Sequence, residues 1–98
     1  MLSLQRLWCK AIGRSVHRCE GRSCALNKLD KKLAPYVDFR DGFFVEVGAN
    51  DGVRQSNTLY FEEYMGWRGL LVEAIPDLAA SCRKNRPKCI VENCALVS

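Results

Sequence analysis

Strand-like segments alternate with helix-like segments over residues 43–97, and this order constrains the fold more than any other feature of the chain. Three segments have the apolar, β-branched and aromatic content of buried strands: residues 43–47, 68–73 and 88–97. The pattern allows a break in the third strand near Asn93. The composition of the strand 43–47 suits burial on both faces of a sheet. Strands that are separated by helices pair in parallel through right-handed crossovers. The order therefore predicts an α/β fold, the first half of a doubly wound sheet.

Two helix-like segments lie between these strands. Residues 56–65 open with good capping residues and stop at Gly66, where a glycine commonly ends a helix. Residues 76–85 begin with a proline, which suits the first turn, and stop before Pro87. Each predicted helix therefore has its own start and stop signals.

Residues 1–41 are predicted to form an N-terminal helical and basic segment ahead of a domain at 42–98. Residues 1–19 have the pattern of an amphipathic helix. A solvated helix packed on the domain is favoured over a mitochondrial-type targeting peptide or a membrane-surface helix, because serine is sparse. A cytoplasmic location is expected, with a mitochondrial or membrane-surface location as the alternatives. A second, short helix is predicted within 25–37, ended by Pro35.

The formal net charge of +4 belongs to residues 1–19, which hold four basic residues and no acid. The rest of the chain holds the other 11 of the 15 basic residues and all 11 acids. Such a balance gives no electrostatic case for nucleic-acid binding. No apolar run approaches the roughly 20 residues that a membrane-spanning helix needs.

Six cysteines are many for 98 residues. They include no C-x-x-C pair, and the only histidine, His17, has no cysteine at ligand spacing, so no metal site is predicted. Their even number allows a disulfide framework, but no cleavable signal peptide precedes it. Reduced thiols, several of them packed as small hydrophobic side chains, are the favoured interpretation.

The loop after the first strand, in "FFVEVGANDG", holds two glycines. In such sheets ligands bind beyond the carboxyl ends of the strands, and Gly48 and Gly52 would let a ligand lie against the backbone there. Glu73 ends the second strand, twenty-one residues after Gly52, where an acid accepts hydrogen bonds from the hydroxyls of a ribose. A nucleoside cofactor is therefore predicted, and the alternative is a tight turn with a solvated glutamate.

Charge selects among the nucleoside cofactors. The loop has the spacing G-x-x-x-G rather than the dinucleotide pattern G-x-G-x-x-G, and it carries Asp51 with Glu46 just before it. Two carboxylates repel a pyrophosphate, and no Gly-Lys-Ser/Thr of a P-loop is present. S-adenosylmethionine has no phosphate and a positive sulfonium, so an acidic glycine turn suits it.

The segments "FFVEVGANDG", "SNTLYFEEYMGWRGLLVEAIP" and "NRPKCIVENCALVS" resemble the FkbM-type S-adenosylmethionine-dependent methyltransferases over about residues 42–98. The resemblance implies a Rossmann-like class I methyltransferase fold, present in part, and O-methylation of a small molecule or sugar. By position it implies these cofactor-binding residues: Glu46, Gly48, Asn50, Asp51 and Gly52 in the loop, Ser56, Asn57 and Thr58 at the first helix, Glu73 at the ribose, and Asn93 near the adenine.

Such a methyltransferase normally has seven strands, and three are predicted here. We expect a fragment of a longer protein, or a sheet completed by another chain, with the edge of strand 43–47 unpaired. No catalytic base is assigned, and the chain alone is expected to be inactive. The alternative function is a non-catalytic FkbM-like binding module, because such domains also resemble parts of animal membrane-trafficking proteins. The intact Gly48, Gly52 and Glu73 favour the enzyme, and the basic N-terminus favours the module.

Overall fold

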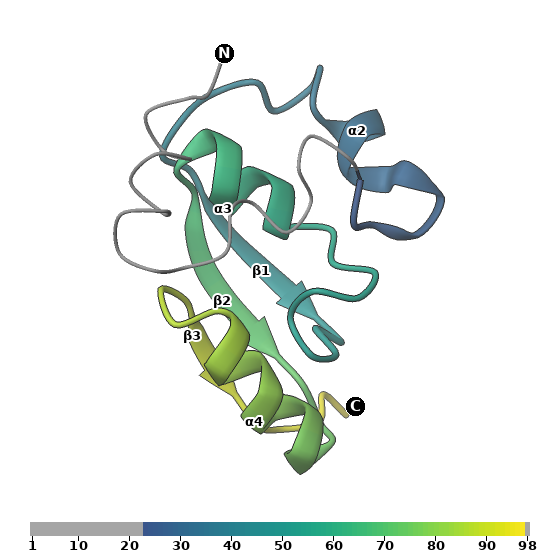
Figure 1. The fold of residues 1–98 in the computed structure, drawn as a ribbon, viewed down its shortest axis with the longest axis vertical. Coiled ribbons are helices and arrows are strands. Elements are labelled where there is room, and N and C mark those ends of the chain that lie inside the picture. The colour runs from purple at the N-terminus through teal and green to yellow at the C-terminus, as the bar shows by residue number, and fades with distance from the viewer. Residues whose placement is uncertain (1–22, 98) are drawn as a thin grey trace.

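The structure is a computed structural model that describes residues 23–97, so the helix predicted over residues 1–19 lies outside the described residues. Its elements are the 3-10 helix η1 (Leu26–Lys28), α2 (Leu29–Leu33), β1 (Phe43–Val47), α3 (Leu59–Met65), β2 (Arg68–Val72), α4 (Pro76–Asn85) and β3 (Ile90–Glu92) (Figure 1). The bounds of β1 and α4 are those predicted. Within the described residues, no helix is long and apolar enough to cross a membrane.

The three strands form one parallel sheet in the order β1, β2, β3. Val45 pairs in register with Leu70, which pairs on its other side with Ile90. Successive right-handed crossovers in one direction place their helices on one side of a sheet, and α3 and α4 both cover the same face (Figure 1). The predicted α/β fold with a parallel sheet is confirmed, and it is compatible with part of a Rossmann-like fold.

The core lies between this face and the two helices. It consists of Phe44, Ala49, Phe61, Trp67, Leu71, Ala79, Cys82 and Val91. Burying each of the larger side chains contributes about 1.5–3 kcal/mol, so this face supplies most of the hydrophobic stabilisation of the described part. The indole N–H of Trp67 donates to the Phe39 carbonyl at 2.7 Å, which satisfies its polar atom inside the core.

The opposite face of the sheet is open. Along β1 the side chains alternate, with Phe44 and Glu46 buried and Phe43, Val45 and Val47 exposed by 64%, 61% and 57%. The sequence suited burial on both faces, but no described helix covers the second one. The far edge of β1 has no paired strand among the described residues, as expected. β1 therefore has the composition of a strand buried on both faces, but only one of its faces is covered.

α3 begins at Leu59 rather than at residue 56, and β2 ends at Val72 rather than at residue 73. Two other elements differ more from the sequence prediction. The short helix within 25–37 is split into η1 and α2, because Asn27 and Lys28 have positive φ angles of 55° and 57°. The third strand spans only Ile90–Glu92 rather than 88–97. It stops where Asn93 turns its side-chain amide to the carbonyls of Glu73 and Ala74, at 2.9 and 3.0 Å. Asn93 thus ties the end of β3 to the end of β2.

Candidate functional site

The loop after β1 begins bonded to the end of β2. The N–H groups of Gly48 and Ala49 both donate to the Val72 carbonyl, at 2.8 and 2.9 Å. Gly48 has a φ of 77°, and a Cβ placed on it would meet no protein atom within 4 Å. The backbone at Gly48 therefore faces open space that a ligand could enter.

The second glycine of the loop is enclosed by protein. Gly52 has a φ of 87°, and a Cβ there would lie 2.7 Å from Cγ of Arg86 and 3.1 Å from Sγ of Cys82. These atoms come from α4 and the residue after it, so Gly52 lets the loop pack closely against them. The sequence assigned ligand approach to both glycines, whereas the structure leaves open space only at Gly48.

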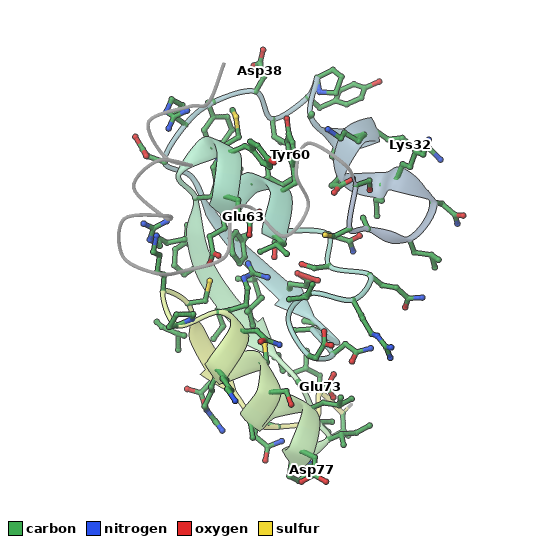
Figure 2. All side chains as sticks on the ribbon, viewed as in Figure 1. Lys32, Asp38, Tyr60, Glu63, Glu73 and Asp77 are labelled. Atoms are coloured by element: carbon green, nitrogen blue, oxygen red, sulfur yellow. The ribbon has the colours of Figure 1, made fainter. Side chains whose placement is uncertain are left out.

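Glu73 lies at the carboxyl end of β2, between the glycine loop and the start of α4 (Figure 2). Its Oε1 accepts from the Asn50 N–H at 2.7 Å, and its Oε2 accepts from the Ile75 N–H at 2.9 Å. The residue is only 7% exposed. Each carboxylate oxygen has one N–H partner and a further lone pair, so the carboxylate can accept two more hydrogen bonds.

Asn50 and Asp51 shape the outer part of the loop. Asn50 has a positive φ of 57°, and its Oδ1 accepts from the Asp51 N–H at 2.8 Å. The Asp51 Oδ1 accepts from the N–H groups of Val53 and Arg54, at 2.9 and 2.8 Å. Burial raises the pKa of Asp51, but the N–H groups of Arg54 and Val53 and the Arg54 charge together bring it below its ordinary value. Asp51 therefore keeps its negative charge at neutral pH.

Glu46 braces the loop from inside the protein. Its carboxylate, on a buried residue, accepts from the hydroxyl of Ser56 at 3.1 Å, from the N–H of Asn57 at 3.2 Å and from the hydroxyl of Thr58. All three donors belong to the segment that leads into α3. The structure thus brings four of the residues implied by the resemblance together as one cluster, in which Glu46, Ser56 and Thr58 are buried and Asn57 is half-buried.

Arg86 completes this cluster, and the sequence analysis missed it. Its side chain is fully buried, and its guanidinium donates to the Gly52 carbonyl at 2.9 Å and to Oε2 of Glu62 at 3.2 Å. A signal was present, because Arg86 follows Ala79 and Cys82 at intervals of seven and four residues. This spacing places an arginine on the apolar side of α4.

The surroundings of the loop carry an excess of negative charge. Among residues 23–97, the buried side chains include the carboxylates of Glu46, Glu62 and Glu73 and one guanidinium, that of Arg86, which forms an ion pair with Glu62. Glu46 and Glu73 receive hydrogen bonds only from neutral donors. Asp51 adds a carboxylate whose charge is opposed by that of the neighbouring Arg54, so the excess rests on Glu46 and Glu73. It favours a ligand that carries positive charge.

The described cysteines differ in state. Cys24 is disulfide-bonded, whereas Cys82, Cys89 and Cys94 are free thiols. The favoured interpretation of reduced thiols therefore holds for three of these four. No group of histidine, cysteine and acidic side chains among residues 23–97 could hold a metal ion.

We expect the stability of the fold to fall as the pH rises from 9 towards 12. Burial, together with the hydrogen bond from its thiol to Glu62 and the charge of that carboxylate, raises the pKa of Cys89 from 9.0 to about 12. Between these values the folded state keeps a proton that the unfolded chain has lost, so the free energy of unfolding decreases with pH. The stabilisation is fully present below pH 9. Urea unfolding on both sides of pH 9 measures it.

Other groups titrate in the same range, so the control is a matched pair of cysteine variants. Cys89→Ala should flatten the pH dependence, whereas Cys94→Ala, at an exposed position, should leave it unchanged. Equal slopes in the two variants would show that Cys89 does not hold its proton in the fold.

A hollow of about 310 Å³ lies beside the free edge of β1. Val45 and Val47 line it together with Leu33 and Val37 from the segment around α2. Most of its lining is apolar, but Glu46, Asn57 and Thr58 also line it, so the hollow borders the segment that leads into α3.

Comparison with protein families gives one match. A family model described as "Methyltransferase FkbM domain" matches residues 46–98, which include the loop, α3, Glu73 and Arg86. No curated protein and no solved structure matches the chain.

Proposed function

The chain belongs to the FkbM methyltransferase family, and from that premise we propose that its described domain binds S-adenosylmethionine for methyl transfer to an oxygen of a small molecule or carbohydrate. The observation that carries the proposal is the hydrogen bond from the Asn50 N–H to Glu73 at 2.7 Å. This bond holds the loop that contains the open backbone of Gly48 next to the Glu73 carboxylate, which has free lone pairs. When bound, the cofactor would supply an electrophilic methyl group on a positive sulfonium.

The ribose of the cofactor is the part that Glu73 would hold. Each carboxylate oxygen of Glu73 accepts a hydrogen bond from one backbone N–H and keeps a lone pair for one of two adjacent ribose hydroxyls. Hydrogen bonds to a carboxylate are charge-assisted and stronger than neutral ones. The backbone N–H partners fix the carboxylate before the ligand arrives, so little ordering is needed on binding.

The charge of the site supports S-adenosylmethionine over a dinucleotide. The buried carboxylates near the loop outnumber the one buried guanidinium, and Asp51 lies on the outer part of the same loop. A sulfonium and an amino group gain from this field, whereas a pyrophosphate is repelled by it.

We propose two roles for the ten residues of the site. Five border the open side of the loop or the end of β3 and would contact the cofactor: Gly48, Asn50, Asp51, Glu73 and Asn93. Five support the loop from the protein side and would hold it in shape: Glu46, Gly52, Ser56, Asn57 and Thr58. We assign no catalytic base. The family match favours the enzyme over a non-catalytic binding module, and the methyl acceptor and the cytoplasmic location stay predictions.

Calorimetric titration of the chain with S-adenosylmethionine, S-adenosylhomocysteine and NAD tests the proposal. We expect the first two to bind and NAD to give no heat of binding, because only NAD brings a pyrophosphate to the acidic loop. Glu73→Gln should weaken S-adenosylhomocysteine binding roughly tenfold or more, since it removes a charged acceptor from the ribose.

The matched control is Asp38→Asn, which removes an exposed carboxylate at the opposite end of the molecule (Figure 2). This variant should bind as the unsubstituted chain does. Tight binding of NAD would overturn the proposed cofactor, and an unchanged affinity of Glu73→Gln would reduce Glu73 to a structural residue of the turn.

A further inference from the structure

We propose that Arg86 is a positioning residue that clamps the glycine loop in the conformation needed for cofactor binding, without touching the cofactor. The inference rests on the proposed function, because it concerns the strength of that binding. Arg86 is fully buried, so none of its atoms is exposed for contact with a ligand on the open side of the loop.

The guanidinium reaches three points of the segment between β1 and α3. Nη1 donates to the Gly52 carbonyl at 2.9 Å and to the Ser56 hydroxyl at 3.3 Å, and Nη2 donates to the Thr58 hydroxyl at 3.2 Å. Nε is used separately, in the pair with Glu62. A planar fork with several donors can serve these points at once, which the single ammonium of a lysine cannot do in the same geometry.

The two hydroxyls connect Arg86 to Glu46. Ser56 and Thr58 each accept from the guanidinium and donate to Oε1 of Glu46. The positive and negative charges thus lie at opposite ends of two hydroxyl bridges, and both bridges belong to the loop segment. Charge-assisted hydrogen bonds of this kind are stronger than neutral ones and hold the segment from both sides.

The clamp acts next to the residues proposed to meet the cofactor. The Gly52 carbonyl that Arg86 holds is only two residues from Asn50, whose N–H bonds to Glu73. Gly52 itself has no room for a Cβ, because Cγ of Arg86 would lie 2.7 Å from it. Arg86 and Glu73 therefore fix the loop at two neighbouring points. A binding site works only when its groups are held within about 0.5 Å of their productive positions.

Three variants test the clamp. Thr58→Val removes one hydroxyl bridge at nearly constant volume, Thr58→Ser keeps it, and Arg86→Lys removes the fork. Amide hydrogen exchange without ligand is the first measurement. We expect residues 49–55 to exchange roughly tenfold faster in Thr58→Val and Arg86→Lys, while the β2 amides keep their protection. The second measurement is the affinity for S-adenosylhomocysteine. It should fall about fivefold or more in these two variants and stay at the value of the unsubstituted chain in Thr58→Ser.

The control is Arg83→Lys, on the exposed side of α4. Arg83 donates only to the Val91 carbonyl, at 3.4 Å, and not to the loop, so this variant should change neither measurement. Loop-specific exchange together with weaker binding supports the clamp.

Unchanged affinity in Thr58→Val, while the unsubstituted chain binds, overturns the clamp and leaves the proposed function standing. Exchange that rises equally in the loop and in β2 also overturns it, because the role of Arg86 is then general stability. If the unsubstituted chain does not bind at all, the proposed function fails and this inference fails with it. Should Arg86→Lys not fold, Thr58→Val and Thr58→Ser decide alone.

Discussion

Replacing Arg86 with methionine is expected to lower the free energy of unfolding by about 3–5 kcal/mol, because removing one partner of a buried ion pair leaves the other charge uncompensated. The charge in question is that of Glu62, which is 7% exposed and bonded to Nε of Arg86. The Gly52 carbonyl loses its donor in the same step. A domain has roughly 5–15 kcal/mol of stability in total, so the loss is a large share of it. Urea unfolding followed by circular dichroism measures the change.

A double variant separates the charge from the packing. Glu62→Gln in the Arg86→Met background removes the uncompensated carboxylate and should recover part of the loss. Arg83→Met, at an exposed position of the same helix, loses only a long hydrogen bond to the Val91 carbonyl at 3.4 Å and should cost no more than about 1 kcal/mol. If Arg86→Met cost no more than Arg83→Met, the buried network would not contribute to the stability of the fold.

The sequence predicted the elements that have strong local signals. Residues 43–47 form a strand and residues 76–85 a helix with the bounds expected, because apolar composition, Pro76 and the nearby Pro87 act within a few residues. The third strand was predicted over residues 88–97 with a break allowed near Asn93, and it spans only Ile90–Glu92, ending just before that break. What ends it is the contact of Asn93 with the Glu73 and Ala74 carbonyls, about twenty residues away in the chain. The local pattern allowed a break at this place, but the contact that ends the strand is a tertiary one.

The sequence predicted which residues lie at the candidate site better than it predicted what each of them does. The spacing of Gly48, Gly52 and Glu73 indicated a loop near an acid, and the structure brings Glu73 to the loop through Asn50. Which glycine faces open space depends on the packing of α4, and that packing is a tertiary property. Arg86 was not predicted because an arginine next to Pro87 in a basic stretch has the pattern of a solvated residue. Its spacing from Ala79 and Cys82 was the contrary signal.

We expect the chain of residues 1–98 to associate with itself through the free edge of β1. Val45 and Val47 are exposed by 61% and 57%, and the edge they border has no paired strand among the described residues. Natural edge strands avoid pairing with other chains by means of charged side chains, prolines or bulges. The only charged residue of β1 is Glu46, and its carboxylate is turned inward to the hydroxyls of Ser56 and Thr58. Gel filtration and sedimentation velocity should therefore show species larger than a monomer.

Two substitutions to lysine decide whether the edge is responsible. Val45→Lys adds a charge to β1 and should shift the chain towards the monomer, as edge lysines do in natural sheets. Leu26→Lys makes the same change at a residue of similar exposure, 58%, on η1 away from the sheet, and should leave association unchanged. If both variants shift alike, association depends on general hydrophobicity rather than on β1. A sharp monomer of the unsubstituted chain, with strongly protected amides over residues 43–47, would show that β1 needs no further strand, since unpaired edge amides exchange readily with water.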